Sequence, residues 1–188
     1  MTSLARPDVS LGPTWAEAVA DFHAAGEQHI HGAGLWDFES LDVTEDGCRE
    51  VVAHLCAQAD PTTPMPEDRV HCTYFWITDG SDDRPEVVGF LALRHELNAW
   101  LLEEGGHIGY AVRPSRRNEG HASRALKLAL AAAADLGLER VLVTCDEVNL
   151  GSRRTIERCG GAYEDSRNGK RRYWIATCRR RAGGTGAK

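Results

Sequence analysis

The chain has 188 residues, of which 42% are hydrophobic and 27% charged, with a formal net charge of −6. This size suits one domain that buries a core without disulfides or metal. No apolar run reaches the ~18 residues of a membrane span, and residues 1–15 lack the basic start and apolar stretch of a signal peptide. The six cysteines form no Cys-x-x-Cys pair, which indicates reduced thiols in a cytoplasmic protein rather than a disulfide framework.

Charge is distributed unevenly along the chain. Residues 1–109 contain 5 Lys and Arg against 20 Asp and Glu, a net charge of −15, whereas residues 110–188 contain 17 against 8, a net charge of +9. Such a split favours two different partners, although solvated surfaces of mixed origin explain it equally well. We expect a single domain over residues 1–178 and a flexible basic tail at 179–188.

The first half of the chain predicts two helices followed by an antiparallel hairpin. Apolar residues three and four apart indicate the helices, and runs rich in β-branched and aromatic residues indicate the strands. After a loose start at 1–12, the predicted elements are a helix at 13–26, a loop at 27–40, a helix at about 46–58, a proline-rich connection at 60–69, and strands at 70–79 and 86–97.

The second half alternates strands and helices and ends in a second hairpin. Asn168-Gly169, between two strand-like arms, is a strong hairpin signal. The predicted elements are strands at 107–113 and 140–146 around a helix at 120–136, a helix from Asn149 to Gly160, and a hairpin at 162–177. This order places the chain in the α/β class, and its strand–helix–strand segment predicts a parallel, right-handed βαβ unit.

The segment Arg117-Asn118-Glu119-Gly120-His121-Ala122 opens the strongest predicted helix. A helix N-terminus has unpaired N–H groups and a partial positive charge, so it binds anions where no side chain blocks approach. Gly120 and Ala122 leave that space, and Arg116 and Arg117 add positive charge. The motif is neither a Walker A loop nor a dinucleotide fingerprint. It predicts a phosphate or pyrophosphate site, with an ordinary helix cap as the alternative.

In this context the chain resembles the GNAT superfamily of acyl-CoA-dependent N-acyltransferases. Arg117, Gly120 and Ala122 match its acyl-CoA signature Gln/Arg-x-x-Gly-x-Gly/Ala, GYAVRP resembles its fourth strand, and VLVTCDEVNLGSRRTIERCGG resembles its fifth strand and following helix. The resemblance covers residues 70–177. It implies a mixed, mostly antiparallel twisted sheet of six to seven strands around the βαβ unit, with about four helices.

The resemblance implies acetyl-CoA as co-substrate. The 117–122 backbone would hold the pyrophosphate, the splayed strand at 110–112 would hold the pantetheine arm and thioester, and Asn149 and an arginine of the following helix would contact CoA. The residues implied are Tyr110, Ala111, Val112, Arg117, Asn118, Glu119, Gly120, His121, Ala122, Ser123, Asn149, Ser152 and either Arg153 or Arg154.

The resemblance leaves the catalytic groups open. The glutamate that often serves as base on the fourth strand falls here on Gly106 or Gly109, and the tyrosine that often serves as acid falls on Ile156. The nearby candidates for the base are Glu103, Glu104 and His107, and His107 has a suitable reference pKa of ~6.5. Candidates for the acid are Ser152, Tyr163 and Tyr173.

The loop at 27–40 is the candidate acceptor pocket, through His29, His31, Trp36 and Asp37. Packing of Trp36 into the core is the alternative. His29 and His31 lack a third ligand at metal-site spacing, so no metal is expected. The acidic N-terminal half favours a cationic acceptor, such as a polyamine, an aminoglycoside-like antibiotic or a basic peptide.

These observations predict a cytoplasmic N-acetyltransferase that acts on a primary amine of a small cationic molecule, with aminoglycosides as the first guess. The alternatives are a protein or peptide amine acetyltransferase and a catalytically silent acyl-CoA-binding protein. Nucleic acid is not an expected partner, because the sequence has no platform of basic and aromatic residues. A membrane is not an expected partner either. The sequence leaves open whether the chain forms a homodimer.

Overall fold

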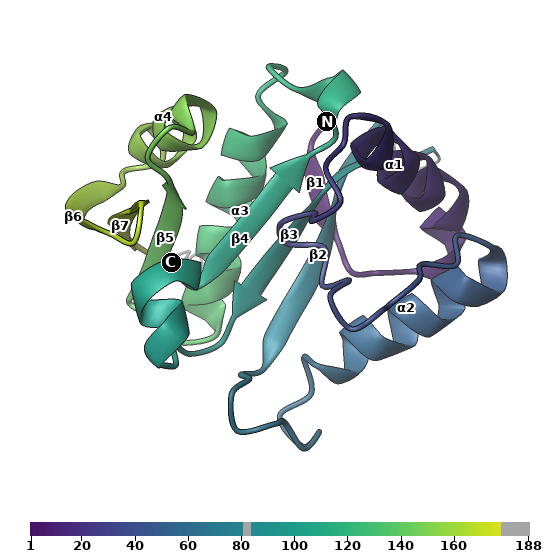
Figure 1. Ribbon diagram of the computed structural model, residues 1–188, viewed down its shortest axis with the longest axis horizontal. Helices are drawn as coiled ribbons and strands as arrows, with labels where there is room; N and C mark the ends of the chain where they lie inside the picture. Colours follow the sequence, from purple (N-terminus) through teal and green to yellow (C-terminus); the bar gives the residue numbers. More distant parts are fainter. Residues whose placement is uncertain (81–83, 178–188) are drawn as a thin grey trace, which may run out of the picture.

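The strand-forming runs join one seven-stranded sheet in the computed structural model, which describes residues 1–80 and 84–177 (Figure 1). Its order is β1-β2-β3-β4-β5-β7-β6. All neighbouring strands are antiparallel except β4 and β5, which are parallel. The strands are β1 (Ser3–Ala5), β2 (Cys72–Asp79), β3 (Glu86–Arg94), β4 (Ile108–Val112), β5 (Arg140–Asp146), β6 (Ala162–Arg167) and β7 (Lys170–Ala176).

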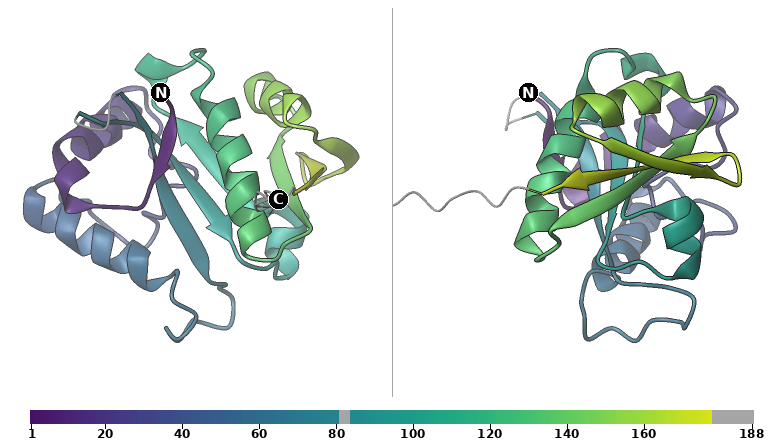
Figure 2. Two further views of the ribbon diagram at one scale, coloured as in Figure 1. Left: turned by 180° about the vertical axis from the view of Figure 1, so that it is seen from behind. Right: turned by 90° about the vertical axis from the view of Figure 1, so that its left-hand side faces the viewer.

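Helices cover both faces of the sheet. They are α1 (Gly12–Ala24), α2 (Glu45–Ala57), α3 (His121–Asp135) and α4 (Leu150–Arg158), with short turns η1 (Val9–Leu11), η2 (Leu101–Gly105) and η3 (Pro114–Arg116). Helices α1 and α2 pack on one face and α3 on the other (Figure 2). On the first face Trp15 stacks on Trp76 with ring centroids 6.0 Å apart. On the second, the small side chains of Ala125, Ala129 and Ala133 bring α3 close to the sheet.

Most elements lie where the sequence predicts them. The sheet, the four α-helices and the βαβ unit β4-α3-β5 are confirmed. Strand β1 falls in a segment that we expected to be loose, because three residues are too few to show a period and pair only at the edge of β2. The segment 98–106, in which the sequence predicts neither helix nor strand, contains η2. The predicted basic tail and Cys178 lie outside the described residues.

The described residues contain five free cysteines. None of the helices in residues 1–80 and 84–177 is long and apolar enough to cross a membrane. The same ranges contain no cluster of three His, Cys, Asp or Glu side chains placed to hold a metal ion.

The feature that positions the site is the separation of β4 from β5. These strands are in register only at Ile108 and Val143, whereas β4 pairs with β3 along its whole length and β5 pairs with β7 along its whole length. Beyond Ile108 the side of β4 that faces β5 therefore has no strand partner. His107 joins the two strands at the point where they separate. Its backbone N–H donates to Leu142 O (2.7 Å), and its ring Nδ1 accepts from the Leu142 N–H (2.9 Å).

Candidate active site

A cleft of about 240 Å³ occupies the separation between β4 and β5. The loop between α1 and α2, η2, the start of α4 and β7 complete its walls. Its lining consists of His31, Gly32, Trp36, Arg94, Trp100, Glu104, Gly105, Ile108, Gly109, Tyr110, Thr144, Cys145, Asp146, Asn149, Ser152 and Lys170. A larger hollow of about 470 Å³ lies between η1 and the start of α2, away from these strands, and its lining contains no candidate from the sequence.

The N-terminus of α3 lies just beyond the end of β4 and has the geometry of an anion site. Gly120 is the N-cap of the helix at φ 83°, a left-handed conformation that disfavours other residues, and no side chain in residues 1–80 and 84–177 caps the helix. The first helical bond is donated by the Arg124 N–H to Gly120 O (3.2 Å). The N–H groups of residues 121–123 therefore have no acceptor in the part of the chain that the structure describes and can bind an anion.

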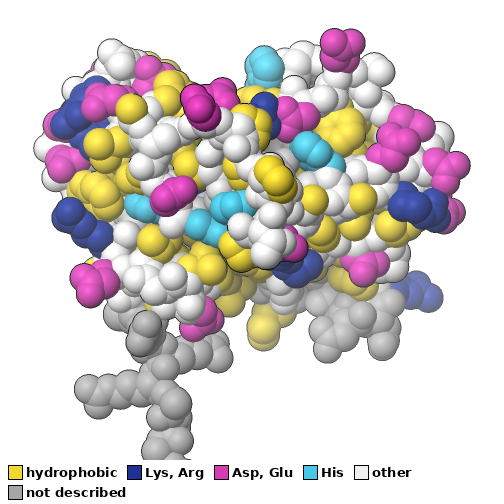
Figure 3. All heavy atoms as spheres, turned by 90° about the horizontal axis from the view of Figure 1, so that it is seen from below, with side chains coloured by type: hydrophobic (Ala, Val, Ile, Leu, Met, Phe, Trp, Pro, Cys, Tyr) yellow, Lys and Arg dark blue, Asp and Glu magenta, His cyan; other side chains and the backbone are white. Residues whose placement is uncertain are grey.

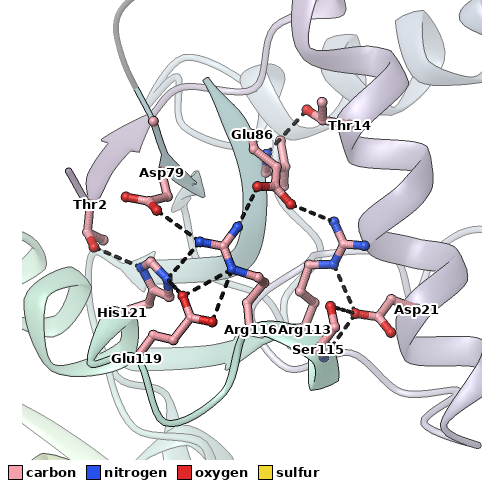
Figure 4. A network of polar contacts seen from close by, with 12 residues as sticks. Thr2, Thr14, Asp21, Asp79, Glu86, Arg113, Ser115, Arg116, Glu119 and His121 are labelled. Atoms are coloured by element: carbon pink, nitrogen blue, oxygen red, sulfur yellow. Dashed lines mark hydrogen bonds and ion pairs between the residues drawn. The ribbon is translucent and has the colours of Figure 1, made fainter. Parts of the chain in front are cut away.

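Arg116, which we expected to add charge to this anion site, is committed elsewhere. Its guanidinium lies among the carboxylates of Asp79 (2.9 Å), Glu86 and Glu119 (3.1 Å), as Figure 4 shows. Arg113 extends the same network to Glu86 (3.2 Å) and to Asp21 of α1 (2.9 Å). The network ties η3 to the sheet and to α1, so Arg116 stabilises the loop and is not available as a phosphate ligand.

Of three other residues that the resemblance implies as CoA contacts, only Asn149 lines the cleft. Arg117 donates to Val112 O (3.0 Å) and to Glu27 (2.8 Å), so it anchors the loop to β4. Asn149 is the N-cap of α4, because its Oδ1 accepts from the Ser152 N–H (2.9 Å), and it lines the cleft. Arg153 pairs with Glu157 on the surface of α4 (2.9 Å).

Two hydroxyl groups meet inside the cleft. Tyr110 Oη on β4 lies 2.9 Å from Ser152 Oγ on α4. Burial raises the pKa of Tyr110 to about 12, so its hydroxyl stays protonated and can donate a hydrogen bond. Ile156 is fully buried in the core, and Tyr173 is buried against Glu157 and Arg171. Neither Ile156 nor Tyr173 lines the cleft.

The three candidates for the base separate clearly. Glu104 of η2 lines the cleft, and β5 holds its backbone there, because Thr144 Oγ1 donates a hydrogen bond to Glu104 O (2.6 Å). Glu103 is paired with Arg167 (2.6 Å) and does not line the cleft. Burial and the charge of Arg94 lower the pKa of His107 to about 4, and its Nδ1 already accepts a hydrogen bond. The geometry therefore favours Glu104.

The predicted acceptor loop reaches the cleft through two of its four named side chains. His31 and Trp36 line it, and Trp36 is exposed rather than packed in the core. His29 stacks on Trp36 with ring centroids 5.9 Å apart. Asp37 lies outside the lining and is held by two hydrogen bonds from Arg69, which lower its pKa together with a bond to His54.

The contact that seats this loop is between Gly32 and β4. Gly32 has φ 82°, and a Cβ there would lie 2.5 Å from Gly109 O, so only glycine fits. Desolvation and the charges of Lys170 and Arg94 lower the pKa of His31, which disfavours its charged form. Sequence reasoning missed the contributions of Arg94, Trp100, Thr144, Asp146 and Lys170, which come from four separate elements and share no motif.

The chain matches the acetyltransferase (GNAT) domain family over residues 16–162. Similar solved structures are MccE, the microcin C7 self-immunity acetyltransferase in complex with acetyl-CoA and AMP (14% identity, TM-score 0.62), Mycobacterium smegmatis RimJ in complex with CoA-disulfide (20%, 0.63), and RimL, a ribosomal L7/L12 alpha-N-protein acetyltransferase (17%, 0.60). Each match covers 93% of this chain, and they cover 92%, 81% and 90% of those chains respectively. No curated protein matches significantly.

At these identities the structural neighbours establish a shared fold. The family match goes further, because it spans most of the chain and includes β4, the loop at Gly120, α3, β5 and α4. The resemblance carried by Arg117, Gly120 and Ala122 is thereby confirmed. The chain belongs to the GNAT family of acetyltransferases.

Proposed function

We propose that this enzyme binds acetyl-CoA across the separation of β4 and β5 and transfers its acetyl group to a primary amine in the cleft. The observation that carries the proposal is the single registered pair, Ile108 with Val143, beyond which one side of β4 is free. Acetyl-CoA has amide groups that need backbone partners and a pyrophosphate that needs donors. The free side of β4 offers backbone partners for the amide groups, and the N–H groups of residues 121–123 offer donors for the pyrophosphate.

In the proposed reaction the amine nitrogen attacks the thioester carbonyl carbon, the carbon–sulfur bond breaks, and the amine proton leaves. Glu104 accepts that proton, directly or through water. The Ser152 hydroxyl donates a hydrogen bond to the departing sulfur, which leaves as the CoA thiolate, and Tyr110 orients this hydroxyl through their 2.9 Å contact. Because each group lies on the cleft wall, positioning of the two substrates contributes much of the rate.

Thiol release with a panel of amines tests this proposal. We expect Glu104→Gln to lower turnover by roughly 10²- to 10⁴-fold while CoA still raises the melting temperature. Glu103→Gln is the matched control, since Glu103 is adjacent but outside the lining, and should keep near-normal turnover. CoA binding without thiol release from any amine would instead identify a catalytically silent acyl-CoA-binding protein.

A protein N-terminus is the second candidate acceptor. Trp36 and Trp100, which are 52% and 58% exposed, flank the cleft and leave apolar surface for a peptide. RimL, which is similar in fold, is described as an alpha-N-protein acetyltransferase. Peptides with free and with blocked α-amines distinguish this acceptor from a small molecule.

The expectation of a polycationic acceptor, aminoglycosides included, finds no support in the cleft. Its lining balances Glu104 and Asp146 against Arg94 and Lys170. Several acids of the N-terminal half, such as Asp37, are bound by arginines. On the face seen in Figure 3, carboxylates are dispersed among apolar side chains and histidines rather than gathered in one surface. It stays a prediction that the same amine panel tests.

A further inference from the structure

Arg94 is a cation of the cleft lining that forms no ion pair with any residue that the structure describes. It stands at the end of β3, half-buried, and its Nη1 donates to Gly105 O (3.0 Å) and Gly106 O (3.1 Å). Within residues 1–80 and 84–177 its Nε and Nη2 make no hydrogen bond, and no carboxylate lies within 4.0 Å of its guanidinium. The other cation of the lining, Lys170, is paired with Asp146.

The two bonds to backbone carbonyls fix the guanidinium of Arg94 at the cleft wall, and its Nε and Nη2 donors stay unused among the described residues. Gly109 leaves the space beside it open: a Cβ at Gly109 would lie 3.7 Å from Nη1 and 3.8 Å from Nη2 of Arg94. The guanidinium therefore lies beside the part of β4 that leads to Tyr110 and the transfer chemistry. A partly buried guanidinium with free donors is well suited to a carboxylate or phosphoryl group.

That anionic group does not belong to the pyrophosphate of CoA. Gly109 and Val112 are separated by three residues of extended strand, about 10 Å, and the free N–H groups of α3 lie farther on, beyond η3. Arg94 lies at the opposite end of β4, next to Gly105 and Gly106.

Glu104 supplies the complementary charge. It also lines the cleft, and its one side-chain contact among the described residues is a hydrogen bond from Asn168 (3.2 Å). The Glu104 carboxylate and the Arg94 guanidinium thus line one cleft without being paired with each other. A molecule with an ammonium group at one end and an anionic group at the other would satisfy both.

We infer that the acceptor carries a carboxylate or phosphoryl group close to its amine, and that Arg94 binds this group. The inference rests on the proposed function and narrows its substrate class. The inference predicts amino acids or amino phosphates as acceptors, and it excludes polyamines and other amines that lack an anionic group.

The test compares matched amines. Phenylalanine is measured against phenylalaninamide and 2-phenylethylamine, and phosphoethanolamine against ethanolamine, which distinguishes the two anionic groups. We expect the wild-type enzyme to prefer an anionic member in kcat/KM. Arg94→Gln should reduce kcat/KM for that member roughly 10- to 100-fold, mainly through KM, as for a lost charged hydrogen bond. Amines that lack the anionic group should lose much less kcat/KM than the anionic member, and Arg94→Lys should restore part of the preference.

Arg49→Gln on the surface of α2 is the control for loss of an arginine. The CoA-dependent rise in melting temperature checks that Arg94→Gln stays folded. Equal turnover of anionic and neutral amines, or an equal loss for both in Arg94→Gln, would overturn the inference and leave the proposed function intact. The absence of thiol release with every amine and free-amine peptide would overturn the proposed function itself.

Discussion

Replacing Gly120 by glutamate tests whether the mouth of α3 holds the pyrophosphate. The new carboxylate would stand beside the free N–H groups of residues 121–123 and repel the phosphates. A ligand at 100 times its Kd stabilises a protein by about 2.7 kcal/mol, which for a chain of this length raises the melting temperature by roughly 5–11 °C. We expect CoA to produce such a shift in the wild type and none in Gly120→Glu.

Gly120→Glu should also lower the free energy of unfolding by about 1–2 kcal/mol, because glutamate is strained in a left-handed conformation. Gly137→Glu is the matched control: Gly137 follows the same helix at its other end, has φ 85°, and a Cβ there would touch nothing within 4 Å. Both variants should lose similar stability without ligand in differential scanning fluorimetry, but only Gly120→Glu should lose the CoA response. Pantetheine, which lacks the pyrophosphate, should affect both alike. A full CoA shift in Gly120→Glu would refute this assignment.

Three further predictions follow from buried positions. Ile156→Ala should lower the free energy of unfolding by about 2–5 kcal/mol, because Ile156 is fully buried, with turnover of the folded protein little changed; a thousandfold loss with stability intact would make Ile156 part of the reaction. The pKa of His107 is lowered to about 4, so its neutral form stabilises the fold above pH 6.5, and this contribution, about 3 kcal/mol, is lost as the pH falls toward 4. Urea unfolding between pH 7 and pH 4 should therefore be less pH-dependent in His107→Asn, and an equal slope would contradict this. Gly32→Ala should raise KM for the amine without changing the CoA shift, since its Cβ would collide with Gly109 O; an unchanged KM would show that the loop does not form the acceptor site.

The sequence determined those features whose physical cause is local. The turn at Asn168 and Gly169 has positive φ at both residues, as an Asn-Gly hairpin requires. Asn149 caps α4, and Gly120 opens α3, because caps depend on residues within one helical turn. The family followed from these local signals taken in their order along the chain.

Only the tertiary structure decided which side chains share the cleft. The sequence alone does not distinguish the surroundings of Arg116 from those of Arg94, yet the first is enclosed by three carboxylates and the second lines the cleft with no carboxylate partner among the described residues. Tyr110 meets Ser152 across a separation of 42 residues. The uneven charge along the sequence likewise does not correspond to two separate charged surfaces, because acids of the first half pair with arginines of the second, as Asp21 does with Arg113. Electrostatic and hydrogen-bonding partners are set by distance in space, and residues far apart in the chain come within that distance only when the sheet assembles.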